Sequence, residues 1–196
     1  STNNQITIPT FSGETYDYTV YWGDGTTSTG VTGEIVHQYN VAGTYTVAIT
    51  GSFPRIYFHE GDNDRDKILT IERWGNNPWT SMRFAFSFCE NLNITNPDID
   101  TPNLSNLTNL TTMFNHCYNF NGDVTNWDVS TVNGMFGMFR EARSFNQDIS
   151  NWNVSNVTNM GSMFEGADAF DQDIGGWDIS SLSNATDMFK YTGLST

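Results

Sequence analysis

The stretch that decides the fold is FNQDISNWNVSNVTNMGSMFEGADA, which spans residues 145–169. The same pattern occupies residues 120–144 and begins again at residue 170, so the sequence repeats every 25 residues. Less regular copies extend back to about residue 79, with one step of 28 residues. A repeat of this length cannot bury its apolar face alone, and it is typical of chains whose successive units stack.

Each repeat divides into two parts. Ile149, Trp152 and Val154 fall in a short stretch that alternates apolar with polar residues, which predicts a strand. From Val157 to Phe170 apolar residues recur every three or four positions, which predicts a helix with one apolar stripe. The fold class expected is an α/β solenoid of the leucine-rich-repeat type, with one short strand and one helix in each 25-residue coil. Because helices are thicker than strands, the stack should curve.

The N-terminal region has a different pattern. It contains no Lys or Arg up to residue 54, and Thr-, Val- and Tyr-rich segments alternate apolar with polar residues at 5–9, 16–22, 34–39 and 44–50. The run Trp22-Gly23-Asp24-Gly25-Thr26 predicts a hairpin, since Gly accepts positive φ and Asp24 can accept hydrogen bonds from the following amides. We expect an antiparallel, β-sandwich-like cap on the solenoid.

The chain is therefore divided into three parts. Residues 1–54 form the β cap. Residues 55–78 connect it to the repeats through two short strands, 55–59 and 67–71, around an acidic loop. Residues 79–196 form a solenoid of about five coils. Because the chain starts at Ser1 without a signal-like segment and its last coil has no cap, we expect an excised fragment of a longer protein.

The charge balance limits the partners. The formal net charge is −14, from 22 acidic and 8 basic residues. Nucleic-acid binding begins with basic side chains that meet phosphates, so the chain is not expected to bind nucleic acid. No apolar run approaches the roughly 20 residues of a membrane span, so no membrane insertion is expected. The charge is compatible with cation binding and with a secreted protein. We expect a monomer.

One polar residue per repeat follows a tryptophan and should face outward, and this row is the candidate ligand-binding surface: Asp128, Asn153 and Asp178. The tryptophans themselves form either a platform for sugar rings or an internal ladder, and their fixed repeat position favours the ladder: Trp127, Trp152 and Trp177. A second acidic column is interpreted as turn residues that cap local N–H groups: Asp123, Asp148 and Asp173.

The acidic loop offers a candidate calcium site. Asp62, Asp64 and Asp66 have the alternation of calcium-binding loops, which places three oxygen ligands on one side. The loop lacks the glycine and the distal glutamate of an EF-hand and carries two basic residues. A solvated acidic loop is therefore favoured, with Ca²⁺ as the alternative and no other cofactor.

Cysteine and histidine give no reactive site. Cys89 and Cys117 occupy one repeat position that later repeats fill with alanine, so both are predicted to be buried, free thiols. On helices of adjacent coils they would also lie too far apart for a disulfide. His37, His59 and His116 are scattered without metal-ligand spacing. His37 is expected in a strand and His116 on a helix.

The repeat pattern F-N-x-D-I-x-x-W-x-V-S-x-V-x-x-M-x-x-M-F-x-x-A resembles the short repeats of BspA-like leucine-rich-repeat surface proteins of bacteria, which also occur in surface lipoproteins of mycoplasmas. The resemblance covers 104–193 closely and 79–103 loosely. The N-terminal region is similar to PKD-type β-sandwich modules, whose marks here are W-G-D-G (22–25), H-x-Y (37–39) and G-x-Y-x-V (43–47).

These resemblances imply an extracellular binding or adhesion protein, displayed on a bacterial surface or secreted, and they supply no catalytic residues. The leading hypothesis is a non-catalytic module that recognises an extended glycan, a peptide or a host or partner protein through many weak contacts. A structural spacer within a large adhesin is the alternative. A polysaccharide-cleaving enzyme is disfavoured because the acids repeat instead of forming one distinctive pair.

Overall fold

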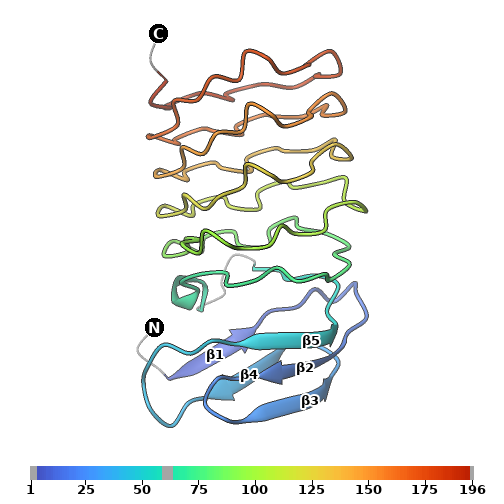
Figure 1. The fold of residues 1–196 in the computed structure, drawn as a ribbon, viewed down its shortest axis with the longest axis vertical. Helices are drawn as coiled ribbons and strands as arrows, with labels where there is room; N and C mark the ends of the chain where they lie inside the picture. Colours follow the sequence, from blue (N-terminus) through green and yellow to red (C-terminus); the bar gives the residue numbers. More distant parts are fainter. Residues whose placement is uncertain (1–3, 59–63, 195–196) are drawn as a thin grey trace.

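The computed structural model describes residues 4–58 and 64–194. Figure 1 shows successive flat coils stacked on an N-terminal β region. We call residues 80–194 the repeat stack. In the described part of the chain, β1 pairs with β4 in one antiparallel sheet and the order β3-β2-β5 forms the other. The strands are β1 (Gln5–Ile8), β2 (Asp17–Tyr21), β3 (Thr27–Val31), β4 (Ile35–Gln38) and β5 (Ala48–Ser52).

Three of the four segments predicted as strands in the N-terminal region contain β1, β2 and β4. The fourth, 44–50, overlaps β5 only at residues 48–50, and β3 was not expected. The hairpin is confirmed, since the Trp22 amide donates to the Thr26 carbonyl at 3.2 Å and joins β2 to β3. The connecting strands are not found in the described residues of 55–59 and 67–71, where one isolated bridge joins Thr70 to Asn93. His59 lies outside the described residues.

The predicted α/β solenoid of the leucine-rich-repeat type is wrong. Helical structure in the described residues is limited to the short 3-10 helix η1 (Arg65–Lys67), which precedes the repeat stack, and the strands are confined to the two small sheets. Each repeat is instead a coil of turns and extended backbone, and isolated parallel bridges link neighbouring repeats at Asn109, Gly134, Asn159 and Asn184.

Tandem turns replace the predicted helix. The Met163 amide donates to the Met160 carbonyl at 3.1 Å, and the Ala167 amide donates to the Phe164 carbonyl at 2.9 Å. The third residue of the first turn, Ser162, has a φ of 52°, which is the left-handed conformation that type II turns require there. In these tandem turns, as in a helix, side chains that point inward recur every three or four residues. The apolar spacing alone therefore did not distinguish tandem turns from a helix.

The amides that a helix would use internally connect the repeats instead. Gly137, Phe139 and Glu141 donate their N–H groups to carbonyls 24 residues further along the chain, at 2.7–2.9 Å. The amides between them close the turns. In this segment every second amide therefore bonds to the next repeat, without a helix or a continuous strand.

Aromatic ladders fill the interior of the repeat stack. Each Phe ring lies nearly parallel to the ring of the next repeat, with centroids 5.8–6.0 Å apart, in the series Phe86, Phe114, Phe139, Phe164 and Phe189. A second column runs beside it through Phe120, Phe145 and Phe170. The methionines that mark the period are buried in equivalent positions: Met138, Met163 and Met188.

Cys89 and Cys117 are buried and free, as predicted, although the helical placement used in that argument is wrong. The Cys117 thiol donates to the Phe86 carbonyl at 3.0 Å, and burial raises its pKa well above the ordinary value. His116 lies on a turn and not on the predicted helix, with Nδ1 at 2.8 Å from the Asn115 side-chain oxygen. Burial lowers the pKa of His116.

Candidate functional site

The predicted ligand row lies on exposed turns of three successive repeats. In Asp128, Asn153 and Asp178 alike, Oδ1 accepts a hydrogen bond from the backbone N–H two residues later, at 3.0–3.2 Å. Bonds from the following serines lower the pKa of Asp128 and of Asp178. Each residue thus has a structural role as an Asx turn. A role in ligand binding stays a prediction.

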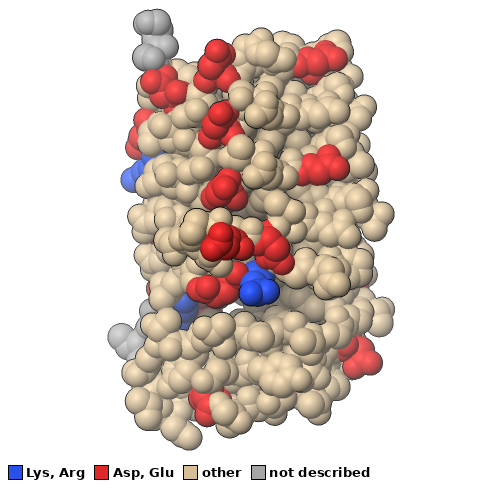
Figure 2. Space-filling view, in the orientation of Figure 1, with Lys and Arg blue, Asp and Glu red and all other residues tan. Residues whose placement is uncertain are grey.

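The second acidic column forms the same kind of turn. Oδ1 accepts from the N–H two residues later, at 2.9–3.0 Å, in Asp123, Asp148 and Asp173. The predicted capping role is therefore confirmed for these three carboxylates. Figure 2 shows acidic side chains recurring from repeat to repeat up this face of the stack.

The tryptophan column is an internal ladder. Trp127, Trp152 and Trp177 are buried, with 4–8 % of their surface exposed. The indole N–H groups of Trp152 and Trp177 donate to backbone carbonyls of the preceding repeat, each at 3.0 Å. Because their ring faces are covered, they offer no platform to a sugar.

The candidate calcium loop is only partly described, since Asp62 lies outside the described residues. Asp64 is buried, and its carboxylate accepts from the Thr7 amide at 2.9 Å and from the Lys67 ammonium group. Asp66 is exposed. Within 4–58 and 64–194, no group of three or more His, Cys, Asp or Glu residues is arranged to hold a metal ion. Asp64 therefore bonds to a lysine and, within the described part of the chain, belongs to no acidic cluster.

The W-G-D-G and H-x-Y motifs form one structural cluster in the β region. His37 stacks on Trp22 with ring centroids 4.4 Å apart, and its Nε2 lies 2.9 Å from Asp24. The Tyr39 hydroxyl donates to the Trp22 carbonyl at 2.9 Å. Hydrogen bonds lower the pKa of Asp24 to about 2, and the Thr26 hydroxyl makes the largest contribution. These contacts hold the hairpin against β4, so the motifs serve the fold.

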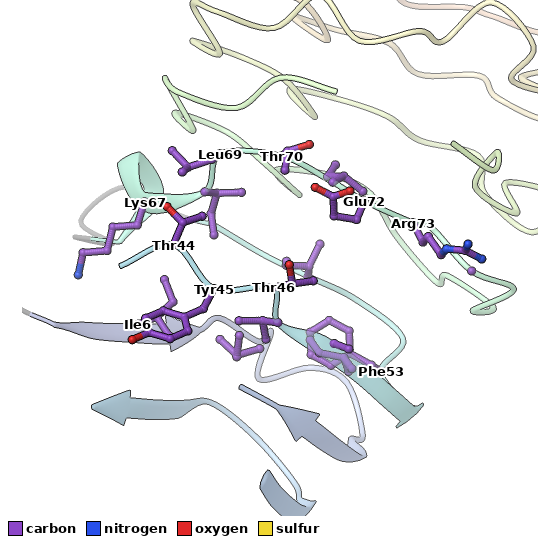
Figure 3. A pocket seen from close by; sticks show the side chains of 18 of the residues that line it. Ile6, Thr44, Tyr45, Thr46, Phe53, Lys67, Leu69, Thr70, Glu72 and Arg73 are labelled. Carbon is purple, nitrogen blue, oxygen red and sulfur yellow. The ribbon is translucent and has the colours of Figure 1, made fainter. Parts of the chain in front are cut away.

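The sequence did not reveal a cleft of about 1270 Å³ between the β region and the first repeat. One wall consists of residues 44–51, which include β5, and the other consists of residues 67–79 (Figure 3). Apolar side chains of the first wall alternate along the chain and are half-buried: Tyr45, Val47 and Ile49. The cleft therefore has an apolar side beside an extended backbone.

The outer edge of β5 lies open along this cleft. β5 pairs with β2 on one side only, and no hydrogen bond joins its other edge to any described segment. On the opposite wall, the Leu69 carbonyl accepts from the Asn93 amide at 3.0 Å, so that segment is bound to the repeat stack. An exposed strand edge is a template for pairing with another chain.

Two buried donors in the cleft lack acceptors. Trp74 and Trp79 line it with 5 % and 9 % of their surface exposed, and neither indole N–H has a hydrogen-bond partner among the described residues. Their rings are held by other aromatic residues, Trp74 against Trp127 and Trp79 against Phe53. A buried donor without a partner costs about 1–3 kcal/mol, so the cleft favours a ligand that carries acceptors.

Basic residues gather at this junction in an otherwise acidic chain. Five of the eight Lys and Arg residues lie between 55 and 83, and this is the one signal in the sequence that could have located the cleft. Figure 3 shows Lys67 at one end of the second wall and Arg73 at the other. Lys67 is bonded to Asp64, whereas exposed Arg73 forms no ion pair with a described residue.

A model of the family described as "Mycoplasma protein of unknown function, DUF285" matches residues 80–194, which is the repeat stack. The predicted relationship to BspA-like leucine-rich-repeat proteins is therefore wrong. No curated protein and no solved structure matches the chain. None of the helices in the described residues has the length and apolar character needed to cross a membrane.

Proposed function

This chain belongs to the DUF285 family of Mycoplasma proteins of unknown function, and from that premise we propose that it is a non-catalytic binding module. Its ligand is an extended polypeptide segment of a partner protein, which lies in the cleft along β5. An extracellular location, on a bacterial surface or secreted, is part of the proposal because the net charge of −14 is compatible with it.

The observation that carries the proposal is the open edge of β5 inside a cleft. A strand that has a partner on one side only can bind an extended peptide through main-chain hydrogen bonds. The cleft leaves room for such a peptide between β5 and residues 68–73. Main-chain bonding supplies affinity, and the flanking side chains supply specificity.

The walls indicate which peptide fits. Because side chains alternate along a strand, one face of an added strand would lie beside Tyr45, Val47 and Ile49 and should be apolar. The indole nitrogens of Trp74 and Trp79 are buried, so carbonyl or side-chain oxygens of the peptide would accept from them after the rings turn toward the cleft. A glycan is the weaker fit, since these buried tryptophans offer N–H groups and not open ring faces.

A peptide display selection on the purified chain tests the proposal. We expect extended peptides with alternating apolar residues, bound more weakly by Trp74→Phe and Trp79→Phe. Each variant keeps an aromatic side chain, replaces the indole by the smaller phenyl ring and removes one donor, so the dissociation constant should rise about threefold to tenfold. As a control, Trp177→Phe removes an indole N–H that already bonds to the Ile149 carbonyl, and it should leave binding unchanged.

Backbone methylation tests the strand geometry directly. N-methylation of every second peptide amide, those that face β5, should abolish binding, while methylation of the intervening amides should have little effect. Binding that does not respond to either tryptophan variant would refute the cleft as the site. Selection of glycans instead of peptides would refute the ligand class, and the absence of any ligand would favour the spacer.

A further inference from the structure

A second pocket, of about 450 Å³, is lined by residues of the segment 55–57, which follows β5. Ile56 lines the large cleft, whereas its neighbours Arg55 and Tyr57 line the small pocket, as expected for extended backbone whose side chains alternate. The two hollows share no lining residue. The other residues of the small pocket are Phe11, Ser81, Arg83, Phe84 and Asn109.

Arg55 is held rigidly in this pocket. Only 8 % of its surface is exposed, and its guanidinium carbon lies 4.0 Å from the ring centroid of Phe11 and 4.8 Å from that of Tyr57. Nη2 donates to the Arg83 carbonyl at 3.2 Å, while Nε is buried without an acceptor. Since the two rings fix the guanidinium, the free in-plane edge is oriented in advance for a ligand.

The two arginines of the pocket have no ion-pair partner within the described chain. Neither Arg55 nor the exposed Arg83 forms an ion pair with a described residue. The nearby carboxylate of Glu14 accepts instead from the Thr80 hydroxyl at 2.7 Å. Burial lowers the pKa of Arg55, the charges of Tyr57, Glu14 and Tyr16 raise it, and the charge of Arg83 lowers it. In a chain with 22 acidic residues, this unpaired arginine couple is a local exception.

We propose that the Arg55–Arg83 pocket binds an oxyanion group, either a carboxylate or a tetrahedral sulfate or phosphate. An oxyanion in the plane of the guanidinium accepts from its donor edge in the bidentate geometry that arginine favours. It would offset the repulsion between the two arginines. The exposed Arg83 side chain supplies the second charge at the pocket.

Thermal melting with simple salts tests this proposal independently of the cleft. Sodium acetate, sulfate and phosphate are compared with sodium chloride at matched ionic strength. We expect at least one oxyanion to raise Tm with a saturable dependence, because a ligand that binds only the folded state stabilises it. A response to acetate alone identifies a carboxylate site, and a response to sulfate or phosphate identifies a site for tetrahedral anions.

Variants locate the effect. Arg83→Gln should reduce the oxyanion-dependent rise in Tm, whereas Arg143→Gln, at a distant exposed arginine, should leave it unchanged. Arg55→Met keeps an unbranched side chain between the two rings and should abolish the rise. Because Arg55→Met also removes a buried charge that has no counter-ion among the described residues, we expect only a small change in Tm without anion.

Two results would overturn the proposal. The first is an equal oxyanion response in the wild type and in Arg55→Met, which would place the anion elsewhere. The second is a wild type without any oxyanion response. If Arg55→Met then also strongly lowers the anion-free Tm, Arg55 is a purely structural residue.

Discussion

The ring of Phe139 lies on the ring of Phe164 in the next repeat, with centroids 6.0 Å apart and planes 9° from parallel. Each of them also lies against the phenylalanine six residues later, which begins the next repeat: Phe145 at 3.8 Å and Phe170 at 4.0 Å. All four side chains are fully buried. This double column of identical rings sets the register of the repeat stack, because a shift of one residue would break every contact at once.

Phe139→Ala should therefore be strongly destabilising. Removal of a fully buried ring leaves a cavity, and we expect the free energy of unfolding to fall by about 3–5 kcal/mol. Phe136→Ala, three residues earlier, is the matched control because 37 % of that side chain is exposed, and its effect should be about 1 kcal/mol or less. Denaturant unfolding measures both. Equal effects would contradict the ladder as the source of stability.

Thr112→Gly should raise stability. Thr112 has a φ of 54°, which is unfavourable for a β-branched residue, and the equivalent position of the next repeat is Gly137. We expect a gain of about 0.5–1 kcal/mol in the free energy of unfolding. Thr108→Gly, at an exposed position outside the left-handed region, should instead lower stability. The same sign for both variants would refute the strain argument.

Asp24 should make stability depend on acid pH. Its pKa is about 2 in the folded chain against an ordinary value of 3.8, so the folded state favours the charged form. Its stabilisation is fully present above about pH 4 and is lost as the pH falls towards 2. Thermal melting of the wild type and of Asp24→Asn across this range tests the prediction. The variant should lose less stability on acidification, and an unchanged slope would contradict it.

The predicted ligand row needs substitutions that separate turn formation from ligand binding. Asp128→Asn and Asp178→Asn keep the oxygen that closes each turn and remove the charge, so the double variant should fold normally. Asn153→Ala removes the acceptor and should cost about 1 kcal/mol. A ligand that loses affinity for the Asn double variant would identify the row as a binding surface. Unchanged affinity would leave the row with its structural role alone.

Asp64→Asn tests the acidic loop. It removes the negative partner of Lys67, and we expect a loss of about 1–3 kcal/mol. Because the Asp64 carboxylate is already bonded to Lys67 and Thr7, a chelator should leave the wild-type Tm unchanged. A rise in Tm with added calcium that disappears in Asp64→Asn would instead establish the calcium alternative.

Local patterns in the sequence predicted much of the structure. The hairpin at Trp22–Thr26 depends on residues that adopt their conformation within one turn, and it was predicted correctly. The buried tryptophans and the free cysteines follow from residues that recur at a fixed repeat position, which is a position in the core. The predicted helix was wrong in the segment from Met160 to Phe170, where tandem turns and a helix share the same apolar spacing, and the connecting strands at 55–59 and 67–71 were not found in the described residues.

By itself, the sequence determined the 25-residue period, the side chains that face inward and the antiparallel character of the N-terminal strands, since each depends on neighbouring residues or on exact repetition. Only the tertiary structure decided that amides bond to the next repeat, because those partners lie 24 residues away. It also decided the two candidate sites. The cleft along β5 and the Arg55 pocket are formed where segments distant in the chain meet, and no local pattern records which donors lack a partner there.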